Sequence, residues 1–322
     1  MTEQAVASRL DRPSPPGGRS LRRAQRIASQ CFAAALQSSC WLFMLVVGGL
    51  AAELIWGARL SIRTFGIGFL WSSQWNPVTQ QFGAAPFIYG TLVTSVIALA
   101  LAAVFGILAA IYLAEFAPRR VGTYLGLLIE LLAAVPSIVY GLWGLFVLAP
   151  IVANWIGPAL QKSLGFLPIF QGTIYGVNVL TASFILTLMI VPTITAITRD
   201  LIAAIPTRNR EAALALGATR WEVASQVVLP AVHRGILGAC LLAFGRALGE
   251  TIATTMVIGN RPVISASLFA PGYTVASVIA NEFTEATSDL YLSALIELGL
   301  ILMVVSLIVI GLGRLMVRLF IR

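Results

Sequence analysis

Lysine and histidine are almost absent from this chain, which has one lysine, Lys162, and one histidine, His233, among its 322 residues. A nucleotide-binding phosphate loop needs the pattern Gly-x-x-x-x-Gly-Lys-Ser/Thr, because the lysine reaches the terminal phosphates. Gln161 stands where the second glycine of that pattern would be. The sequence therefore excludes an ATPase site of this kind, and it offers no serine, histidine and carboxylate set that would indicate a hydrolase.

Cysteine is also scarce. Cys31, Cys40 and Cys240 are odd in number and lie in or near apolar stretches. This pattern favours small core residues over a disulfide framework or a thiolate metal site. A lone histidine at the edge of an apolar stretch is more typical of a surface or interface residue than of a ligand. The sequence therefore predicts neither a metal site nor a cofactor held by this chain.

Charge is the third shortage: 11% of the residues are charged and 58% are hydrophobic, whereas soluble domains have about 25% charged residues. This composition indicates an integral membrane protein. A membrane helix needs about 20 apolar residues. Stretches of that length predict an all-α fold with six spans, near residues 33–57, 87–114, 122–154, 174–198, 235–258 and 291–315.

The third stretch contains Pro136 and is long enough to hide two short spans. A seventh span would move the arginine-rich loop of residues 199–234 across the membrane, so parity favours one tilted or broken span. With six spans and a cytoplasmic N-terminus, sixteen of the 21 cationic residues lie inside, four lie outside, and Arg246 lies within a span. The positive-inside rule then predicts a multi-pass protein of the cytoplasmic (inner) membrane with both termini inside. Residues 1–32 are predicted to form a disordered basic tail that contacts anionic lipid, and residues 33–322 the transmembrane domain.

Residues 208–230, called the coupling segment below, lie between two predicted spans. Thr207 is a candidate cap for a first helix, Gly217 is placed to end it, and Thr219 with Glu222 has the spacing of a capping box for a second helix. The spacing predicts a compact helical elbow on the membrane surface. The elbow resembles the EAA loop of ABC importer permeases through Glu211, Ala212, Ala213, Gly217, Val227, Leu229 and Pro230. An ordinary amphipathic interfacial helix is the alternative.

Arg246 lies near the centre of the fifth apolar stretch, where a guanidinium costs about 3 kcal/mol or more, so it needs an anion nearby. Glu250 follows four residues later and is expected on the same helical face. This order is the less favourable one for an i,i+4 pair, so a purely structural ion pair explains it weakly. Gly245 and Gly249 flank the pair at a spacing that admits close approach of another helix. We therefore place both charged residues on a translocation path.

Several blocks resemble the phosphate-specific ABC permeases of the PstC type: residues 130–144, 245–251, 255–260, 276–283 and 292–299. The resemblance runs from about residue 87 to the C-terminus and implies the type I ABC importer permease fold. It also implies that the arginine and glutamate of the fifth span, here Arg246 and Glu250, belong to the pore for inorganic phosphate. Phosphate offers anionic oxygens to an arginine and a hydroxyl to a carboxylate, whereas sulfate has no hydroxyl. Glu250 is therefore expected to favour phosphate over sulfate.

Glu130 and Ser137 are further candidates for the substrate path. Pro136 breaks the helical ladder, so a half-helix beginning there can present free amides and the Ser137 hydroxyl to an anion; a plain packing kink explains it equally well. Glu53, Glu130, Glu250 and Glu297 outnumber Arg246 within the predicted spans. We expect at least one of them to pair with an arginine of another subunit.

The resemblance implies the partners as well. These are a second homologous permease of the PstA type, an ATPase dimer of the PstB type that binds ATP and Mg²⁺, and an external phosphate-binding protein of the PstS type. Membrane lipid is expected as a partner and nucleic acid is not. A permease for sulfate or molybdate, or the sister phosphate permease subunit, shares the coupling segment, while a secondary transporter working without ATP is a different class.

The predicted external loop, residues 260–290, carries three acidic and three aromatic residues. They are candidates for contact with the receptor protein, and a solvated connector explains them as well. The residues are Glu282, Glu285, Asp289, Phe269, Tyr273 and Phe283.

Overall fold

In the computed structural model, which describes residues 18–320, the chain is helical and divides into two units at Leu54. Helix α2 crosses that boundary, so its first part is one unit and residues 54–320 form the other. Short π-helical turns follow or precede several helices of the second unit. The α-helices are α2 (Gly18–Phe65), α3 (Gly68–Trp71), α4 (Ala85–Ile111), α5 (Arg119–Ala133), α6 (Ser137–Trp143), α7 (Ala149–Ile151), α8 (Gly157–Leu164), α9 (Val179–Ala203), α10 (Thr207–Ala215), α11 (Arg220–Glu222), α12 (Leu229–Leu248), α13 (Ile252–Val257), α14 (Val275–Glu282) and α15 (Asp289–Phe320).

Of the predicted tail, residues 1–17 lie outside the described residues, and residues 18–32 are the first turns of α2.

Six helices among the described residues are long and apolar enough to cross a membrane. The number agrees with the prediction, but the third span was placed wrongly. It runs over Ser137–Leu164, and α5 is a separate helix that ends at Ala133. Pro136 causes the break, because proline disfavours a helical residue before it and has no N–H to donate. The sequence is apolar on both sides of the break, so a prediction from hydropathy alone treats the two helices as one span.

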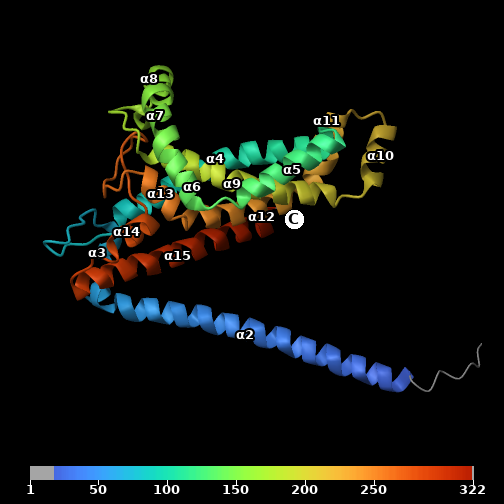
Figure 1. Cartoon of the computed structure of the whole chain (residues 1–322), viewed down its shortest axis with the longest axis horizontal. Helices are drawn as coiled ribbons and strands as arrows, with labels where there is room; N and C mark the ends of the chain where they lie inside the picture. Colours follow the sequence, from blue (N-terminus) through green and yellow to red (C-terminus); the bar gives the residue numbers. More distant parts are fainter. Residues whose placement is uncertain (1–17, 321–322) are drawn as a thin grey trace, which may run out of the picture. The chain divides into compact units, whose positions relative to one another are not determined.

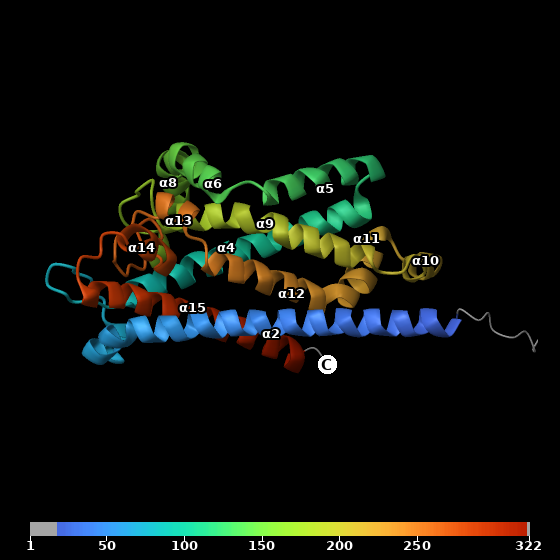
Figure 2. The same cartoon turned by 60° about the horizontal axis from the view of Figure 1, so that its bottom comes forward.

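Helix α9 lies at the centre of the second unit and packs against α4 and α12 (Figure 2). Two of its buried hydroxyl groups find acceptors within the helix: Ser183 donates to the carbonyl of Val179 at 2.8 Å, and Thr187 donates to that of Ser183 at 2.7 Å. Such local pairing lowers the cost of burying a hydroxyl group, and Thr195 also donates to the Gly106 carbonyl of α4 at 3.2 Å. Gly106 of α4 faces the side chain of Ile194 and lets the two helices approach closely.

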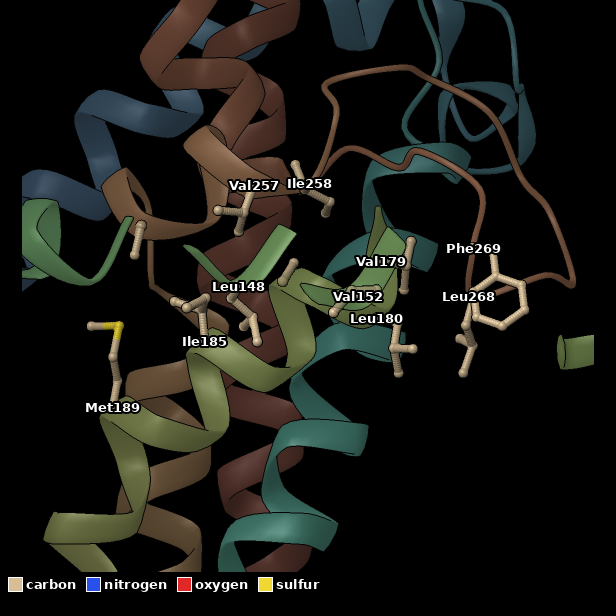
Figure 3. Packing of buried hydrophobic residues seen from close by; sticks show 12 residues of the cluster. Leu148, Val152, Val179, Leu180, Ile185, Met189, Val257, Ile258, Leu268 and Phe269 are labelled. Carbon is tan, nitrogen blue, oxygen red and sulfur yellow. The ribbon is translucent and has the colours of Figure 1, made fainter. Parts of the chain in front are cut away.

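The two ends of the second unit differ. Helices α10 and α11 lie at one end, and α8, α13 and α14 lie at the other (Figure 1). At the latter end, side chains from α9, α13 and the loop before α14 form one apolar cluster, which includes the wholly buried Ile185, Ile258 and Phe269 (Figure 3). This cluster anchors the irregular segments around the break between α12 and α13, where the candidate substrate residues lie.

Candidate translocation path and coupling segment

The coupling segment has the caps that its sequence predicted, apart from one, but its second helix is not a separate short helix: it continues from Arg220 through α12 to Leu248 as the fifth candidate span. At the end of α10 the Gly217 N–H donates to Leu214 and the Ala218 N–H to Ala213, while Gly217 has φ +90°. This is a Schellman motif, which favours glycine at the left-handed position. Thr219 and Glu222 form the predicted capping box at the start of α11. Thr207 was predicted wrongly as a cap: Pro206 precedes α10, and Thr207 is already helical.

Arg210 connects the coupling segment to two helices of the bundle. Its guanidinium donates to the carbonyl oxygens of Ile202 and Ile205 at 2.7 Å each, at the end of α9. Its Nη2 also lies 2.9 Å from Glu115 Oε1, on the π-helical turn Tyr112–Phe116 that ends α4. A cation at a helix C-terminus offsets the unpaired carbonyls there. The pair is largely buried, with 19% of the arginine and 12% of the glutamate side chain exposed.

Some apolar side chains of the coupling segment are packed against the bundle, and others are exposed. Ala213 and Leu229 pack on a buried cluster formed with the ends of α4 and α9. In contrast, the side chains of Leu214, Leu216 and Trp221 are 47%, 90% and 58% exposed. Exposed apolar side chains grouped on a polar surface are typical of a protein contact. Of the EAA residues, Ala213 and Leu229 therefore seat the segment and Gly217 shapes its turn, whereas Glu211 and Ala212 are exposed, as are these three apolar side chains.

Arg246 occupies a different position from the one predicted. Helix α12 ends at Leu248, so Arg246 lies in its last turn and not at the middle of a continuous span to residue 258. Its side chain is exposed and has no hydrogen bond or ion pair within residues 18–320. It lines a groove of about 530 Å³ between α12 and α15. Gly245 lies against Ile310 of α15, so the predicted close approach of another helix is confirmed at this glycine.

Glu250 follows the helix break and does not form the predicted i,i+4 pair with Arg246. Its Oε1 accepts a hydrogen bond from the Ala253 N–H at 3.4 Å, at the start of α13. The chain leaves helical geometry between Leu248, where α12 ends, and Ile252, where α13 begins. Helix α12 therefore ends between Arg246 and Glu250, which is the arrangement of a discontinuous membrane helix.

The half-helix expected after Pro136 is present as α6, with Pro136 before its first residue Ser137. Tyr140 donates from Oη to the Leu132 carbonyl at 2.9 Å and so bridges the break. Gly141 faces Ala253 and Met256, because α6 packs on α13. The structure thus packs α6, which begins at Ser137, against α13, the helix that follows the break after Leu248.

Glu130 is not brought to that site. It lies on α5 outside the six candidate spans and pairs with Arg199 of α9, with 2.8 Å between Oε1 and Nη2. Arg199 also contacts Asp200 at 3.1 Å, and the absence of a side chain at Gly126 makes room for its guanidinium. The prediction that Glu130 sits within a span was wrong, because it depended on the misplaced third span.

The segment before α15 is more buried than predicted. Phe269 and Tyr273 are core residues, 0% and 4% exposed, so they are not available to a receptor. Glu282 points into the molecule and accepts hydrogen bonds from Trp75 Nε1 at 2.7 Å, Tyr273 Oη at 3.2 Å and Tyr291 Oη at 2.5 Å. Phe283 and Glu285 remain exposed.

Sequence reasoning missed the partners of Arg210 and the place of Arg314 beside Arg246. Both residues were counted only as cytoplasmic charges. The position of Arg210 directly before the EAA residues was the available signal for its role. Within residues 18–320 there is no group of three or more histidine, cysteine, aspartate or glutamate side chains that could hold a metal ion.

Six membrane helices, a discontinuous fifth span and a surface elbow between spans define the membrane component of an ABC importer. The fold agrees: it is similar to a chain of the bacterial ABC transporter involved in import of the acidic polysaccharide alginate, with a TM-score of 0.60 and 15% identity, covering 94% of this chain and 100% of that one. A chain of the MetNI methionine ABC transporter matches with a TM-score of 0.53 and 16% identity over 73% of this chain and 94% of that one. At such identities the likeness shows the fold alone.

Sequence similarity is more specific. Residues 102–322 match the family model of the binding-protein-dependent transport system inner membrane component. The chain is 46% identical to the phosphate transport system permease protein PstC of Mesorhizobium japonicum over 88% of each chain, and 43% identical to that of Xylella fastidiosa over 94% of each. It therefore belongs to the family of binding-protein-dependent transport system inner membrane components, among the PstC-type phosphate transport permeases. It is a multi-pass inner membrane protein and not the ATPase of such a system.

Proposed function

We propose that this chain passes inorganic phosphate through the inner membrane into the cell and forms the path together with a second, homologous permease of the PstA type. Arg246 is the observation that carries the proposal. An exposed guanidinium without an internal partner, on a helix of a membrane protein, needs an anion. The relatives named as phosphate transport permeases support phosphate as that anion.

Arg246 and Glu250 have complementary roles in this proposal. The guanidinium offers N–H donors to the anionic oxygens of phosphate, and the carboxylate accepts the phosphate hydroxyl. The helix break supports the pairing, because α12 ends just before Glu250 and frees backbone groups at this level. Sulfate has no hydroxyl at neutral pH. Its oxygen lone pairs would therefore face those of the Glu250 carboxylate, and this repulsion disfavours sulfate binding. The Ser137 end of α6 supplies a further polar contact to the same space.

The orientation follows from charge. Both termini and the coupling segment lie in the cytoplasm, and Phe283 and Glu285 lie outside, where a phosphate receptor of the PstS type approaches. Two ATPase subunits of the PstB type bind the coupling segments of this chain and of its sister permease. They bind ATP and Mg²⁺ and hydrolyse the ATP, a reaction for which this chain has no site.

Motion of the ATPases reaches the path through the coupling segment. When the ATPases close on ATP, α10 moves, and Arg210 carries the movement to the ends of α9 and α4 because it bonds to both. Helix α9 packs on α12, which bears Arg246. The switch from inward-facing to outward-facing then exposes Arg246 to phosphate released from the receptor, and reopening releases the phosphate inside.

The test is uptake of labelled phosphate by vesicles that contain the full complex of both permeases, the ATPase dimer and the receptor. We expect phosphate-stimulated ATP hydrolysis and uptake, both lost in Arg246→Gln and retained in Arg261→Gln, a matched control on an exposed arginine outside the spans. Glu250→Gln should lower phosphate uptake and narrow the preference for phosphate over sulfate. Full uptake by Arg246→Gln would refute the proposed path.

Two outcomes would point to the alternatives. Faster uptake of sulfate or molybdate than of phosphate would assign the chain to another oxyanion. Transport by the single chain without ATPase, unaffected by deletion of residues 208–217, would indicate a secondary transporter.

A further inference from the structure

The groove beside Arg246 contains a second arginine. Two helices form it, α12 and α15, which lie side by side in both views (Figures 1 and 2). The only charged side chains among its lining residues are the two arginines, and no carboxylate lines it. The lining residues are Gly238, Leu241, Leu242, Gly245, Arg246, Ile310 and Arg314.

Glycine residues set the register of the two helices. A Cβ placed on Gly313 would collide with Leu241, and one on Gly245 would lie 3.3 Å from Ile310. The contact pairs run in opposite directions along the two helices, so the helices are antiparallel. At about 1.5 Å of rise per residue, the two contact levels are about 6 Å apart. Arg246 lies at the level of Ile310, and Arg314 lies next to Gly313, one helical turn toward the end that carries the coupling segment.

Two guanidinium groups that line the same groove, one from α12 and one from α15, repel each other. Arg314 is exposed, and no ion pair to it exists within residues 18–320. It lies at the end of the sixth candidate span, Asp289–Leu315, directly before the last residue of that span. A groove that holds two such cations and no carboxylate is suited to an anion that both can contact, together or in turn.

We propose that Arg314 is a second anion-binding residue of the translocation path, which receives phosphate after Arg246 on its way to the cytoplasm. This inference rests on the proposed function. The path then has two guanidinium groups about one turn apart, so phosphate exchanges one set of N–H donors for another and does not pass directly from Arg246 into water. Weak binding at successive sites favours passage, because the anion leaves each site readily.

The chemistry recognised by Arg314 is a phosphate oxyanion, which a lipid headgroup also carries. Arg314→Gln, Arg314→Lys and the control Arg318→Gln separate the two sources in the reconstituted complex. Arg318 lies one turn further along the same helix, is exposed and does not line the groove. We expect Arg314→Gln to lower the maximal rate of phosphate uptake about tenfold, as loss of a charge-assisted hydrogen bond does. Arg314→Lys should retain more of the rate, and Arg318→Gln should match the unaltered complex.

The defect of Arg314→Gln should be the same in vesicles of phosphatidylcholine alone and in vesicles that contain phosphatidylglycerol. A defect seen only with phosphatidylglycerol would mean that Arg314 binds lipid, and it would overturn the inference. Loss of the second permease on co-purification of Arg314→Gln would also overturn it, because Arg314 would then pair with a carboxylate of that subunit. An uptake rate equal to that of Arg318→Gln would overturn it as well.

These results are distinct from failure of the proposed function. If the unaltered complex does not take up phosphate, or if Arg246→Gln is fully active, the path itself is wrong. If Arg246→Gln is inactive while Arg314→Gln is unimpaired, the path remains and only the role of Arg314 is lost.

Discussion

The guanidinium of Arg210 and the carboxylate of Glu115 form an ion pair, 2.9 Å apart, between the coupling segment and the end of α4. The same guanidinium donates to two carbonyl groups at the end of α9. One side chain therefore joins three parts of the chain that are separate in sequence. If α10 moves, either α4 and α9 move with it or the charge-assisted hydrogen bonds of Arg210 break.

Arg210→Gln is therefore expected to uncouple ATP hydrolysis from transport. Removing one partner of a largely buried pair costs about 3 kcal/mol, because the other charge is left unpaired. We expect the complex to assemble and hydrolyse ATP while phosphate uptake per ATP falls several-fold. The measurement is the ratio of uptake to hydrolysis in vesicles.

A matched variant separates coupling from folding. Glu115→Gln should lower the same ratio less, because Arg210 keeps its bonds to α9. Arg208→Gln is the control, since Arg208 lies on the same helix with its side chain exposed. An unchanged ratio in Arg210→Gln would show that the movement reaches the bundle by apolar packing alone.

Leu216 gives a prediction about the ATPase contact. Its side chain is 90% exposed at the end of α10, and an apolar side chain in such a position contributes to affinity only when a partner covers it. Leu216→Asp should reduce co-purification of the ATPase about tenfold or more without changing the thermal unfolding of the isolated chain. Val263→Asp, at an exposed apolar position at the opposite end of the bundle, should leave the ATPase bound. Normal ATPase binding by Leu216→Asp would place the contact elsewhere.

The coupling segment could be predicted from the sequence because its signals are local. Gly217 and the Thr219–Glu222 capping box each act over three or four residues, so the sequence contains the whole interaction. Thr207 was chosen for its capping hydroxyl, but Pro206 occupies the cap position without a side-chain hydrogen bond, and Thr207 is already helical. The fixed φ of proline also suits a helix start, so the helix begins one residue earlier than the capping pattern indicates.

The helix breaks at Pro136 and after Leu248 were harder to predict. Apolar residues continue through both, so hydropathy extends each stretch past its true end. Arg246 and Glu250 then appeared as one i,i+4 pair, whereas a helix terminus separates them. Long-range pairs such as Arg199 with Glu130, or Arg210 with Glu115, depend on which helices pack together, and a single sequence does not supply that information.

Tyr273 makes stability at the α14 end of the bundle sensitive to alkaline pH. Burial, reinforced by the charge of Glu282, raises the pKa of Tyr273 above its ordinary value of about 10. The folded state therefore keeps the phenol proton at a pH where the unfolded chain loses it. The resulting stabilisation is lost progressively as pH rises above about 10, because the unfolded state binds fewer protons there. Below that pH the group makes no pH-dependent contribution.

Thermal unfolding in lipid nanodiscs between pH 8 and pH 11 checks this expectation. Tyr273→Phe should flatten the alkaline fall in melting temperature, whereas Tyr175→Phe, at an exposed tyrosine, should not. Equal slopes in Tyr273→Phe and the unaltered protein would assign the alkaline instability to other groups.

Glu282 is predicted to stabilise the same end by satisfying three donors at once. Its carboxylate accepts from Trp75, Tyr273 and Tyr291, and Trp75 also packs edge-on against Phe82 and Phe87. Glu282→Ala leaves these part-buried donors without their acceptor, which costs about 2 to 4 kcal/mol in total. The melting temperature in nanodiscs should fall by several degrees, as expected for such a loss in a domain of this size. Glu285→Ala, three residues away on an exposed side chain, should change it little. If Glu282→Ala and Glu285→Ala both have the melting temperature of the unaltered chain, the hydrogen bonds of Glu282 contribute no net stability. Aromatic packing would then stabilise this end without the carboxylate.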